Sequence, residues 1–295
     1  MRVTYDGALQ KGVTPKDMIL HLIGKLGAKA GNGYAVEYTG AAVRALAVEG
    51  RLTVCNMSIE MAARYGTVAA DDVTFEYLHG REFAPKDALW DRAVAFWRSL
   101  PSDDGAAFDR EVNVAARTIV PMVTWGTSPA HVVGVGERVP DPAGAPDAAT
   151  RAAWSRALEY TGLTPGDAIE GTPIDVAFIG SCTNSRLSDL RRAASVVKGA
   201  KVASNLRRAW VVPGSGQVKR DAEAEGLDRQ RLHRLDAVID AAPIVRIVEP
   251  DAQLVLTRPG QARWAPASEV TDDYGAAPGA VLRIAGTQGE GEDLR

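Results

Sequence analysis

The sequence is poor in cysteine, in aromatic residues and in long apolar runs. Its 295 residues include two cysteines, and aromatic residues make up 6% of the chain. Two thiols exclude a disulfide framework, and they also exclude a site for which this chain alone supplies four sulfur ligands. No apolar run approaches the roughly 18 residues that a membrane helix needs, so we expect a soluble chain without membrane partners.

The charge balance lacks the basic excess that is typical of nucleic-acid binding. Lys and Arg total 34 against 37 Asp and Glu, which gives a formal net charge of -3. This balance argues against a nucleic-acid partner and disfavours an RNA-binding role. The first ten residues, MRVTYDGALQ, lack the apolar segment of a signal peptide, and a cytoplasmic location is therefore expected.

Signatures of several common chemistries are also missing. The four histidines form no HxxxH or HxH pair of the kind that binds metal. Two glycine pairs, in 134–136 and 214–216, complete neither a dinucleotide-binding motif nor a P-loop, and we interpret both as turns. No GxSxG sequence indicates a serine nucleophile.

Hydrophobic periodicity in residues 1–133 predicts alternating strands and helices. Thr14 is a plausible N-cap and Pro15 suits the first position of a helix that ends at Leu26. Tryptophans 90 and 97 recur at helical spacing, and we interpret this aromatic stripe as core rather than as a cofactor site. The remaining predicted elements are strands at 2–5, 34–38, 52–54 and 118–125, and a helical segment at 57–65 that Gly66 ends.

A proline- and glycine-rich stretch over 134–150 is the best linker candidate, and we place a domain boundary there. Beyond it the pattern predicts a helix that stops at Gly162, then strand 174–179, helix 187–197 and strand 209–212. Alternation of strands and helices favours the α/β class. The expected domains are 1–133 and 151–227, and residues 228–295 form a tail that resembles nothing identifiable.

Three residues stand out as candidates for chemistry. Cys182 lies where a predicted strand ends and a helix begins, a position that favours a thiolate ligand or nucleophile. A buried, inert thiol is the alternative. Asn56 and Glu60 are four residues apart, so on one helix they share a face; a solvated helix surface is the alternative for them. Cys55 follows an apolar run and is expected in the core.

Four stretches together resemble the large subunits of 3-isopropylmalate dehydratases, in the aconitase superfamily. They are RLTVCNMSIEMAARYG, VTWGTSPAHV, FIGSCTNSRLSDLRRAA and VVPGSGQVKRDAEAEGL. The resemblance covers about residues 1–227. It implies layered α/β/α domains of the aconitase type, incomplete at both ends, and a small-subunit partner. It also implies a hydro-lyase of leucine biosynthesis that isomerises 2-isopropylmalate, a small hydroxyacid, to 3-isopropylmalate by dehydration and rehydration.

The resemblance further implies a [4Fe-4S] cluster held by three cysteines, with one iron free to act as a Lewis acid on the substrate. Cys182 matches the first metal ligand. Thr183 and Asn184 fall in the same SCTN signature and would line the cofactor. Asn56 and Glu60 match the catalytic residues of an NMxxE motif, in which the amide lies beside the cluster and the carboxylate helps to order water.

The sequence departs from the family pattern in two regions. The DHN and GDSHTSTHG motifs that supply active-site histidines do not occur, and neither a CxxC nor an SNRNF motif follows Leu227. One hypothesis is an internal fragment whose reading frame changes near residue 228. The alternative is an inactive remnant or scaffold that binds no cluster, and the cysteine count distinguishes the two.

Overall fold

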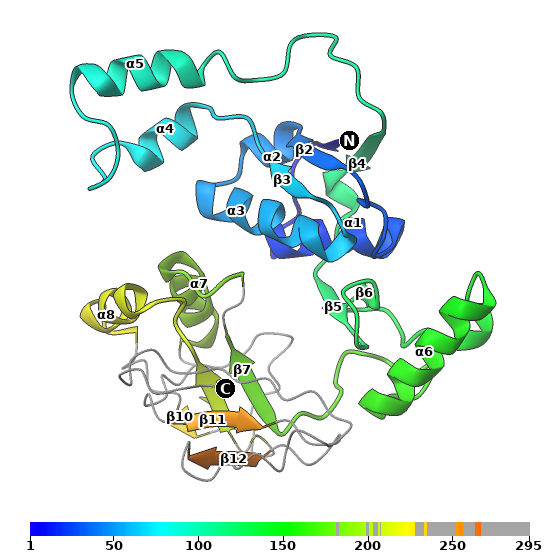
Figure 1. The fold of residues 1–295 in the computed structure, drawn as a ribbon. Helices are drawn as coiled ribbons and strands as arrows, with labels where there is room; N and C mark the ends of the chain where they lie inside the picture. The colour runs from blue at the N-terminus through cyan, green and yellow to red at the C-terminus, as the bar shows by residue number, and fades with distance from the viewer. Residues whose placement is uncertain are drawn as a thin grey trace, which may run out of the picture. The chain divides into compact units, whose positions relative to one another are not determined.

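The computed structural model describes residues 1–180, 183–198, 201–202, 206, 208–227, 233–234, 252–255 and 263–266. The chain divides into two compact units, Met1–Glu137 and Arg138–Arg295, and each is described by itself (Figure 1). The division falls inside the stretch 134–150 that the sequence suggests as a linker. The domain ranges proposed above stay a prediction.

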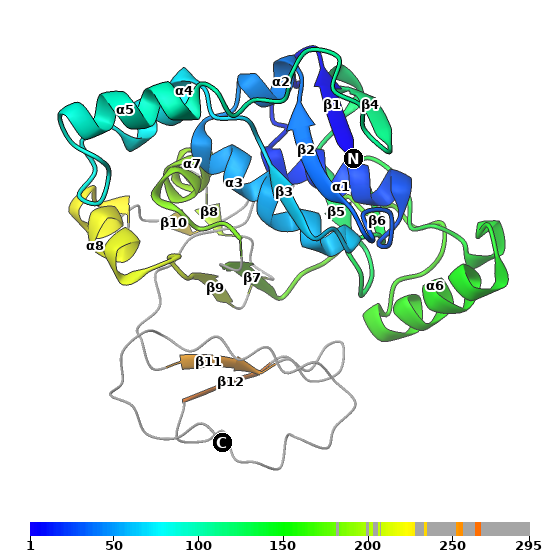
Figure 2. The ribbon, with the colours of Figure 1, turned by 45° about the horizontal axis from the view of Figure 1, so that its top comes forward.

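Unit 1 is built on a four-stranded parallel sheet in the order β3-β2-β1-β4 (Figure 2). The strands are β1 (Arg2–Asp6), β2 (Ala35–Thr39), β3 (Tyr65–Thr67) and β4 (Glu111–Ala115). Val3 pairs with Tyr38 of β2 on one side and with Val112 of β4 on the other. The predicted strands at 2–5 and 34–38 are thereby confirmed, as is the α/β class.

Helix α1 (Pro15–Leu26) begins where the sequence predicts. The Thr14 backbone N–H donates to Asp17 Oδ2 at 2.6 Å, and the Asp17 N–H donates to Thr14 Oγ1 at 3.3 Å. This reciprocal capping satisfies amide groups that have no partner within the helix. Asp17 also accepts a hydrogen bond from the Met122 N–H at 2.7 Å, so the same carboxylate joins the start of α1 to a distant segment.

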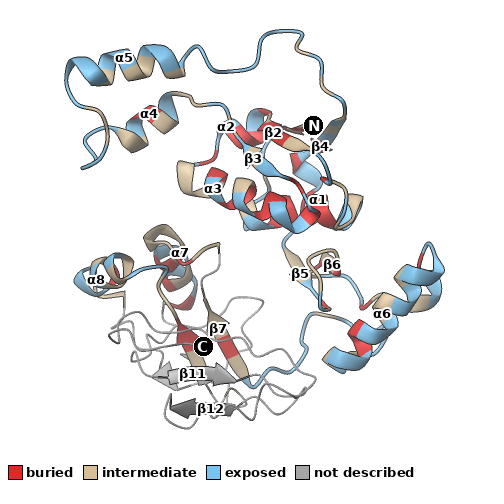
Figure 3. Ribbon diagram, viewed as in Figure 1, coloured by how far each residue is buried: buried red, intermediate tan, exposed pale blue. Residues whose placement is uncertain are grey.

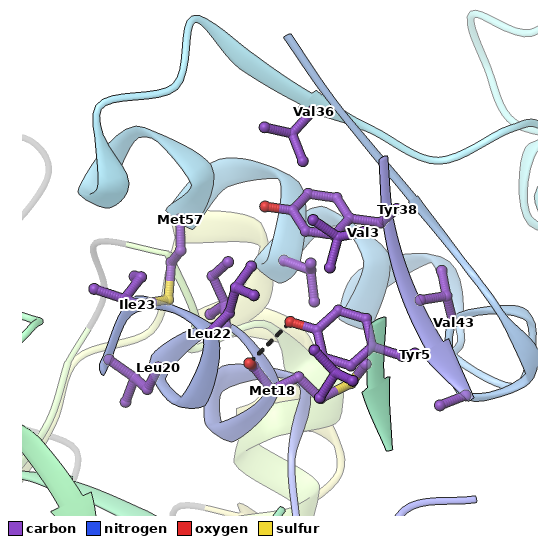
Figure 4. Close-up of a cluster of buried hydrophobic side chains, with 14 of the residues drawn as sticks. Val3, Tyr5, Met18, Leu20, Leu22, Ile23, Val36, Tyr38, Val43 and Met57 are labelled. Carbon is purple, nitrogen blue, oxygen red and sulfur yellow. Dashed lines mark hydrogen bonds between the residues drawn. The ribbon is translucent and has the colours of Figure 1, made fainter. Parts of the chain in front are cut away.

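One face of the sheet forms the core of unit 1. Residues alternate along β1 and β2, and the inward side chains are Val3, Tyr5, Val36 and Tyr38, each at most 1% exposed. They pack with the apolar face of α1 in a single cluster (Figure 4). The Tyr5 hydroxyl donates to the Met18 carbonyl of α1 at 3.0 Å, so its polar end is satisfied inside the core.

Residues 52–54 are helical, which corrects the prediction of a strand. They lie in α3 (Val48–Asn56), which follows the short helix α2 (Ala41–Arg44) and continues into a 3-10 helix, η1 (Met57–Met61). Thr53 and Val54 are buried whereas Leu52 is 44% exposed, because the helix turns Leu52 away from the core. The helical segment predicted over 57–65 ends at Met61, and Gly66 lies inside β3 rather than at a helix end.

The strand predicted over 118–125 is shorter than expected. A 3-10 turn, η2 (Ala116–Thr118), comes first, and the strand is β5 (Met122–Thr124). It pairs antiparallel with β6 (Val132–Gly134). Two prolines, Pro121 and Pro129, flank β5 and its connecting turn, and a proline supplies no N–H for a strand ladder.

The aromatic stripe contacts a neighbouring helix instead of entering the core. Trp97 of α5 (Ala88–Trp97) stacks on Phe75 of α4 (Asp72–Leu78) with ring centroids 6.0 Å apart, and Trp90 meets His79 edge-on at 5.0 Å. No residue of α5 is buried (Figure 3). The predicted core role of the stripe is therefore wrong, since two helices by themselves cannot enclose it.

Arg51 links α3 to the start of α4 and is 4% exposed. Its guanidinium donates to both carboxylate oxygens of Asp71, at 2.6 and 2.9 Å, and to the carbonyls of Leu46 and Arg44. Asp71 also caps α4 by accepting from the Thr74 N–H. Burial by itself would raise the pKa of Asp71, but the hydrogen bonds from Arg51 and Thr74 outweigh it and hold that pKa below its usual value.

Unit 2 contains two parallel strands, β7 (Val176–Ile179) and β9 (Arg208–Val211). Helix α7 (Leu187–Val197) follows β7, and α8 (Gly216–Ala224) follows β9. Leu190, Val211 and Ala222 from three of these elements form a small core. Helix α6 (Ala148–Thr161) ends at Gly162 with φ 71°, so the predicted helix stop is confirmed.

The rest of unit 2 contributes η3 (Pro142–Gly144) and two strand pairs. β8 (Lys201–Val202) pairs in parallel with β10 (His233–Arg234), and β11 (Ala252–Val255) pairs antiparallel with β12 (Arg263–Pro266). Most of residues 228–295 lie outside the part that the structure describes. Among the described helices, none is both long enough and apolar enough to cross a membrane.

Replacing Arg51 by Ala should lower the free energy of unfolding by about 2–4 kcal/mol, because buried carbonyls and the Asp71 carboxylate lose their donor. Urea unfolding followed by circular dichroism measures this loss. Arg98→Ala is the matched control: Arg98 pairs with Asp72, and both side chains are more than half exposed. That variant should lose less than about 1 kcal/mol. Equal losses in the two variants would contradict the assigned role of Arg51.

Candidate functional site

Asn56 and Glu60 lie on the turn that connects α3 to β3. Asn56 is the last residue of α3, and Glu60 lies in η1. Both are exposed, while Met57, Ser58 and Met61 are buried beneath them. The turn therefore has a buried side that fixes it to the sheet and an outer side that presents an amide and a carboxylate. The sequence placed the two residues on a single helix; the structure divides them between an α-helix and a 3-10 helix.

Cys55 precedes Asn56 but points to a different environment. It is half-buried and packs against the core of unit 1. Burial raises the pKa of its thiol to about 11, although the charge of Arg51 opposes the shift. A thiol with this pKa is almost wholly protonated at neutral pH, and the thiolate is the form that binds metal or attacks an electrophile. Cys55 is thus a packing residue.

The GSCTNS segment joins β7 to α7 in unit 2. Ser181 and the predicted metal ligand Cys182 lie outside the described residues. Thr183 and Asn184 are half-buried and lie in the loop that leads to α7. The loop thus follows the carboxyl end of a parallel strand, where ligands bind in open α/β sheets.

Ser185 is a residue of this loop that the sequence reasoning passed over. It is 1% exposed and adopts a left-handed conformation with φ 65°, which is uncommon for a residue other than glycine. Its carbonyl accepts a hydrogen bond from the Gly214 N–H at 2.8 Å. This bond joins the loop to the PGSG turn, in which Ser215 caps α8 by accepting from the Val218 N–H. Residues 214 and 215 form a bend, as the sequence predicts, whereas Gly216 is the first residue of α8 and not part of a turn.

The VTWGTSPAHV segment is structural. It forms β5, a tight turn and the start of β6, and Trp125 and His131 stack inside it with ring centroids 4.8 Å apart. The Trp125 N–H donates to the His131 carbonyl at 2.9 Å. A Cβ at Gly126 would lie 2.5 Å from His131 Nδ1, so only glycine fits there. Burial lowers the pKa of His131 and so favours the neutral ring.

Residues 1–241 match the model of the Aconitase family (aconitate hydratase). The chain belongs to the aconitase family. The match covers both candidate segments, the turn with Asn56 and Glu60 and the loop with Thr183 and Asn184. The parallel sheet flanked by helices agrees with this membership.

Two curated relatives carry names that go beyond the family. The chain is 59% identical over 229 residues to the 3-isopropylmalate dehydratase large subunit 1 of Bradyrhizobium diazoefficiens. It is 55% identical over 229 residues to the 3-isopropylmalate dehydratase large subunit of Roseiflexus castenholzii. In both cases the alignment covers 78% of this chain and 48% of the relative. The chain thus spans about half the length of the curated relatives it matches.

Members of the aconitase family typically bind an iron–sulfur cluster, but the residues of this chain do not fit one. Such a cluster needs several cysteine thiolates. The sequence holds two cysteines, and Cys55 is a protonated packing residue, so Cys182 is the one thiolate candidate. Within the described ranges, no three His, Cys, Asp or Glu side chains gather closely enough to hold a metal ion.

The packing of Cys55 predicts a slow thiol. In a Cys182→Ser variant, Cys55 is the single remaining cysteine, and it should react with a disulfide reagent only slowly at pH 8. The rate of this reaction should rise as the pH approaches 11, because the fraction of Cys55 present as thiolate increases as the pH approaches the pKa of the thiol. The same variant unfolded in urea is the control and should react at the rate of a free thiol. A fast reaction of the folded variant at pH 8 would contradict the packing role.

Ligand counting predicts that the chain alone forms no stable cluster. After anaerobic incubation with iron and sulfide and removal of excess reagents, the protein should lack the visible absorbance of an iron–sulfur cluster. The reason is that one thiolate cannot replace the several that such a cluster requires. A brown protein with stoichiometric iron and sulfide would refute this expectation.

Proposed function

We propose that this chain is part of the large subunit of a 3-isopropylmalate dehydratase. The reaction removes water from 2-isopropylmalate and adds it back at the neighbouring carbon, which yields 3-isopropylmalate. The single observation that carries the proposal is 55–59% identity over 229 residues to large subunits of that name. The partner would be the corresponding small subunit, as the name of the relatives implies. A cytoplasmic location stays a prediction.

The exposed side of the α3–η1 turn supplies the chemistry that we assign to this chain. The Asn56 amide can donate to an oxygen of the hydroxyacid and accept from its hydroxyl group. The Glu60 carboxylate can accept a proton or orient a water molecule for addition to a double bond. Both side chains lie at the surface of unit 1, so a substrate can reach them without opening the core.

We further propose that Thr183 and Asn184 line the cofactor and that Cys182 supplies a thiolate to it. This grouping rests on the match of their segment to the family motif. This chain alone does not provide the ligands of a cluster. The remaining donors would have to come from residues that this chain does not contain.

The second candidate is an inactive member of the family that keeps the fold and binds no cluster. The cysteine count favours it for the polypeptide taken alone. The two candidates differ in whether residues 1–227 retain catalytic competence when the missing ligands are supplied.

A graft tests this difference. Residues 1–227 of this chain replace the matching segment of the Bradyrhizobium diazoefficiens large subunit. The grafted large subunit is then combined with the small subunit of the same organism. We expect the graft to convert 2-isopropylmalate. The absorbance of 2-isopropylmaleate measures this conversion. Glu60→Gln should lower kcat by about 10²–10⁴-fold, because the substitution removes the acid–base group.

Glu76→Gln is the matched control, since Glu76 is an exposed glutamate on α4 of the same unit. It should leave kcat unchanged. A folded graft without activity would support the inactive remnant and sink the proposed function. An active graft in which Glu60→Gln behaves like Glu76→Gln would remove Glu60 from the site.

A further inference from the structure

Beneath the exposed turn that carries Asn56 and Glu60 lies a closed pair of hydroxyl groups. The Tyr38 hydroxyl of β2 and Ser58 Oγ of η1 are 2.7 Å apart, and the two residues are 1% and 0% exposed. Ser58 Oγ also lies 3.1 Å from the Val54 carbonyl of α3, to which it donates. One serine side chain thus connects the sheet, the last turn of α3 and the 3-10 helix.

The direction of these bonds follows from the number of protons. Ser58 has one hydroxyl proton, and the Val54 carbonyl can only accept, so the Ser58 proton is used there. The Tyr38 hydroxyl must then donate to Ser58 Oγ. Burial raises the pKa of Tyr38 above its usual value. Tyr38 therefore keeps its proton at any physiological pH and remains a donor.

The neighbouring strand closes the space around the pair. A Cβ at Gly66 of β3 would lie 2.2 Å from Ser58 Oγ and 2.9 Å from Tyr38 Cε2. The backbone of β3 therefore approaches the pair as closely as a residue without a side chain allows. Each hydroxyl has its partner within the fold, and loss of one leaves a buried polar group unsatisfied.

We infer that the Tyr38–Ser58 hydrogen bond positions the turn that presents Asn56 and Glu60. The Ser58 hydroxyl bonds to the Val54 carbonyl and to Tyr38 of the sheet. Asn56 lies in the chain between Val54 and Ser58, and Glu60 lies two residues after Ser58. A serine that donates to a carbonyl four residues earlier bends a helix, and here that bond spans the point where α3 becomes η1. Tyr38 and Ser58 are positioning residues, because neither is exposed to a substrate. Their assignment to a reaction rests on the proposed function.

The chain offers a matched control for the loss of a buried tyrosine hydroxyl. Tyr5 of β1 lies next to Tyr38, with ring centroids 6.4 Å apart, and is 0% exposed. Its hydroxyl donates to the Met18 carbonyl of α1, away from the turn. Tyr5→Phe therefore removes one buried hydrogen bond, as Tyr38→Phe does, and should cost comparable stability without moving the turn.

The test uses nuclear magnetic resonance of the full folded chain. Tyr38→Phe and Ser58→Ala should shift the side-chain amide signals of Asn56 and the carboxyl signal of Glu60, whereas Tyr5→Phe should leave them in place. The double variant Tyr38→Phe, Ser58→Ala leaves no unpaired hydroxyl, so it should unfold at no lower urea concentration than Ser58→Ala. Its Asn56 and Glu60 signals should nevertheless remain shifted. Wild-type signal positions in Tyr38→Phe, or signals that return in the double variant, would overturn the inference.

A kinetic measurement in the graft separates this inference from the proposed function. Tyr38→Phe should lower kcat about tenfold and leave KM within about twofold, because small displacements of reacting groups affect rate more than binding. Tyr5→Phe should leave both constants unchanged. Equal kcat values in the two variants would overturn the positioning role. If the unmodified graft is inactive, the proposed function fails, and the resonance signals still decide whether the hydrogen bond sets the two side chains.

Discussion

The packing of one sheet face against α1 is the constraint on which unit 1 depends. Side chains alternate between the two faces of a strand, so Val3 and Tyr5 on β1 and Val36 and Tyr38 on β2 must all point inward together. A slip of either strand by one residue would turn its two inward side chains outward. The register that builds the core also brings the Tyr38 hydroxyl to Ser58. Through this hydrogen bond, Tyr38 of the buried strand contacts the turn that carries Asn56 and Glu60.

The number of cysteines limits which cofactor this chain can hold by itself. Members of the family typically bind a cluster, yet the two cysteines of this chain are too few to hold one. Cys55 lies on the same helix as Asn56, but its side chain is half-buried against the core and stays protonated. Cys55 is therefore not a candidate metal ligand, although it is next to Asn56 in the sequence, because burial disfavours the thiolate that metal binding requires. The chain matches the family over most of its length without the cysteines that a cluster needs.

Several residues of the family motifs make contacts that stabilise the fold. The segment with Trp125 and His131 closes a hairpin, and its glycine is needed because the imidazole lies against the backbone. Ser185 joins the GSCTNS loop to the turn before α8 through its carbonyl. Such contacts fix where neighbouring side chains lie, so these motif residues hold the backbone in place through bonds within the fold.

The sequence by itself determined the α/β class, the capped start of α1, the family resemblance and the cysteine count, because each depends on local patterns or on composition. It did not determine whether residues 52–54 form a strand or a helix. Leu52, Thr53 and Val54 are too few to show a period, so only the burial of Thr53 and Val54 in the folded core decides. The Arg51–Asp71 pair and the Tyr38–Ser58 bond each join residues 20 apart in the chain. Contacts of that kind arise from the crossing of elements in space, and the tertiary structure alone supplied them.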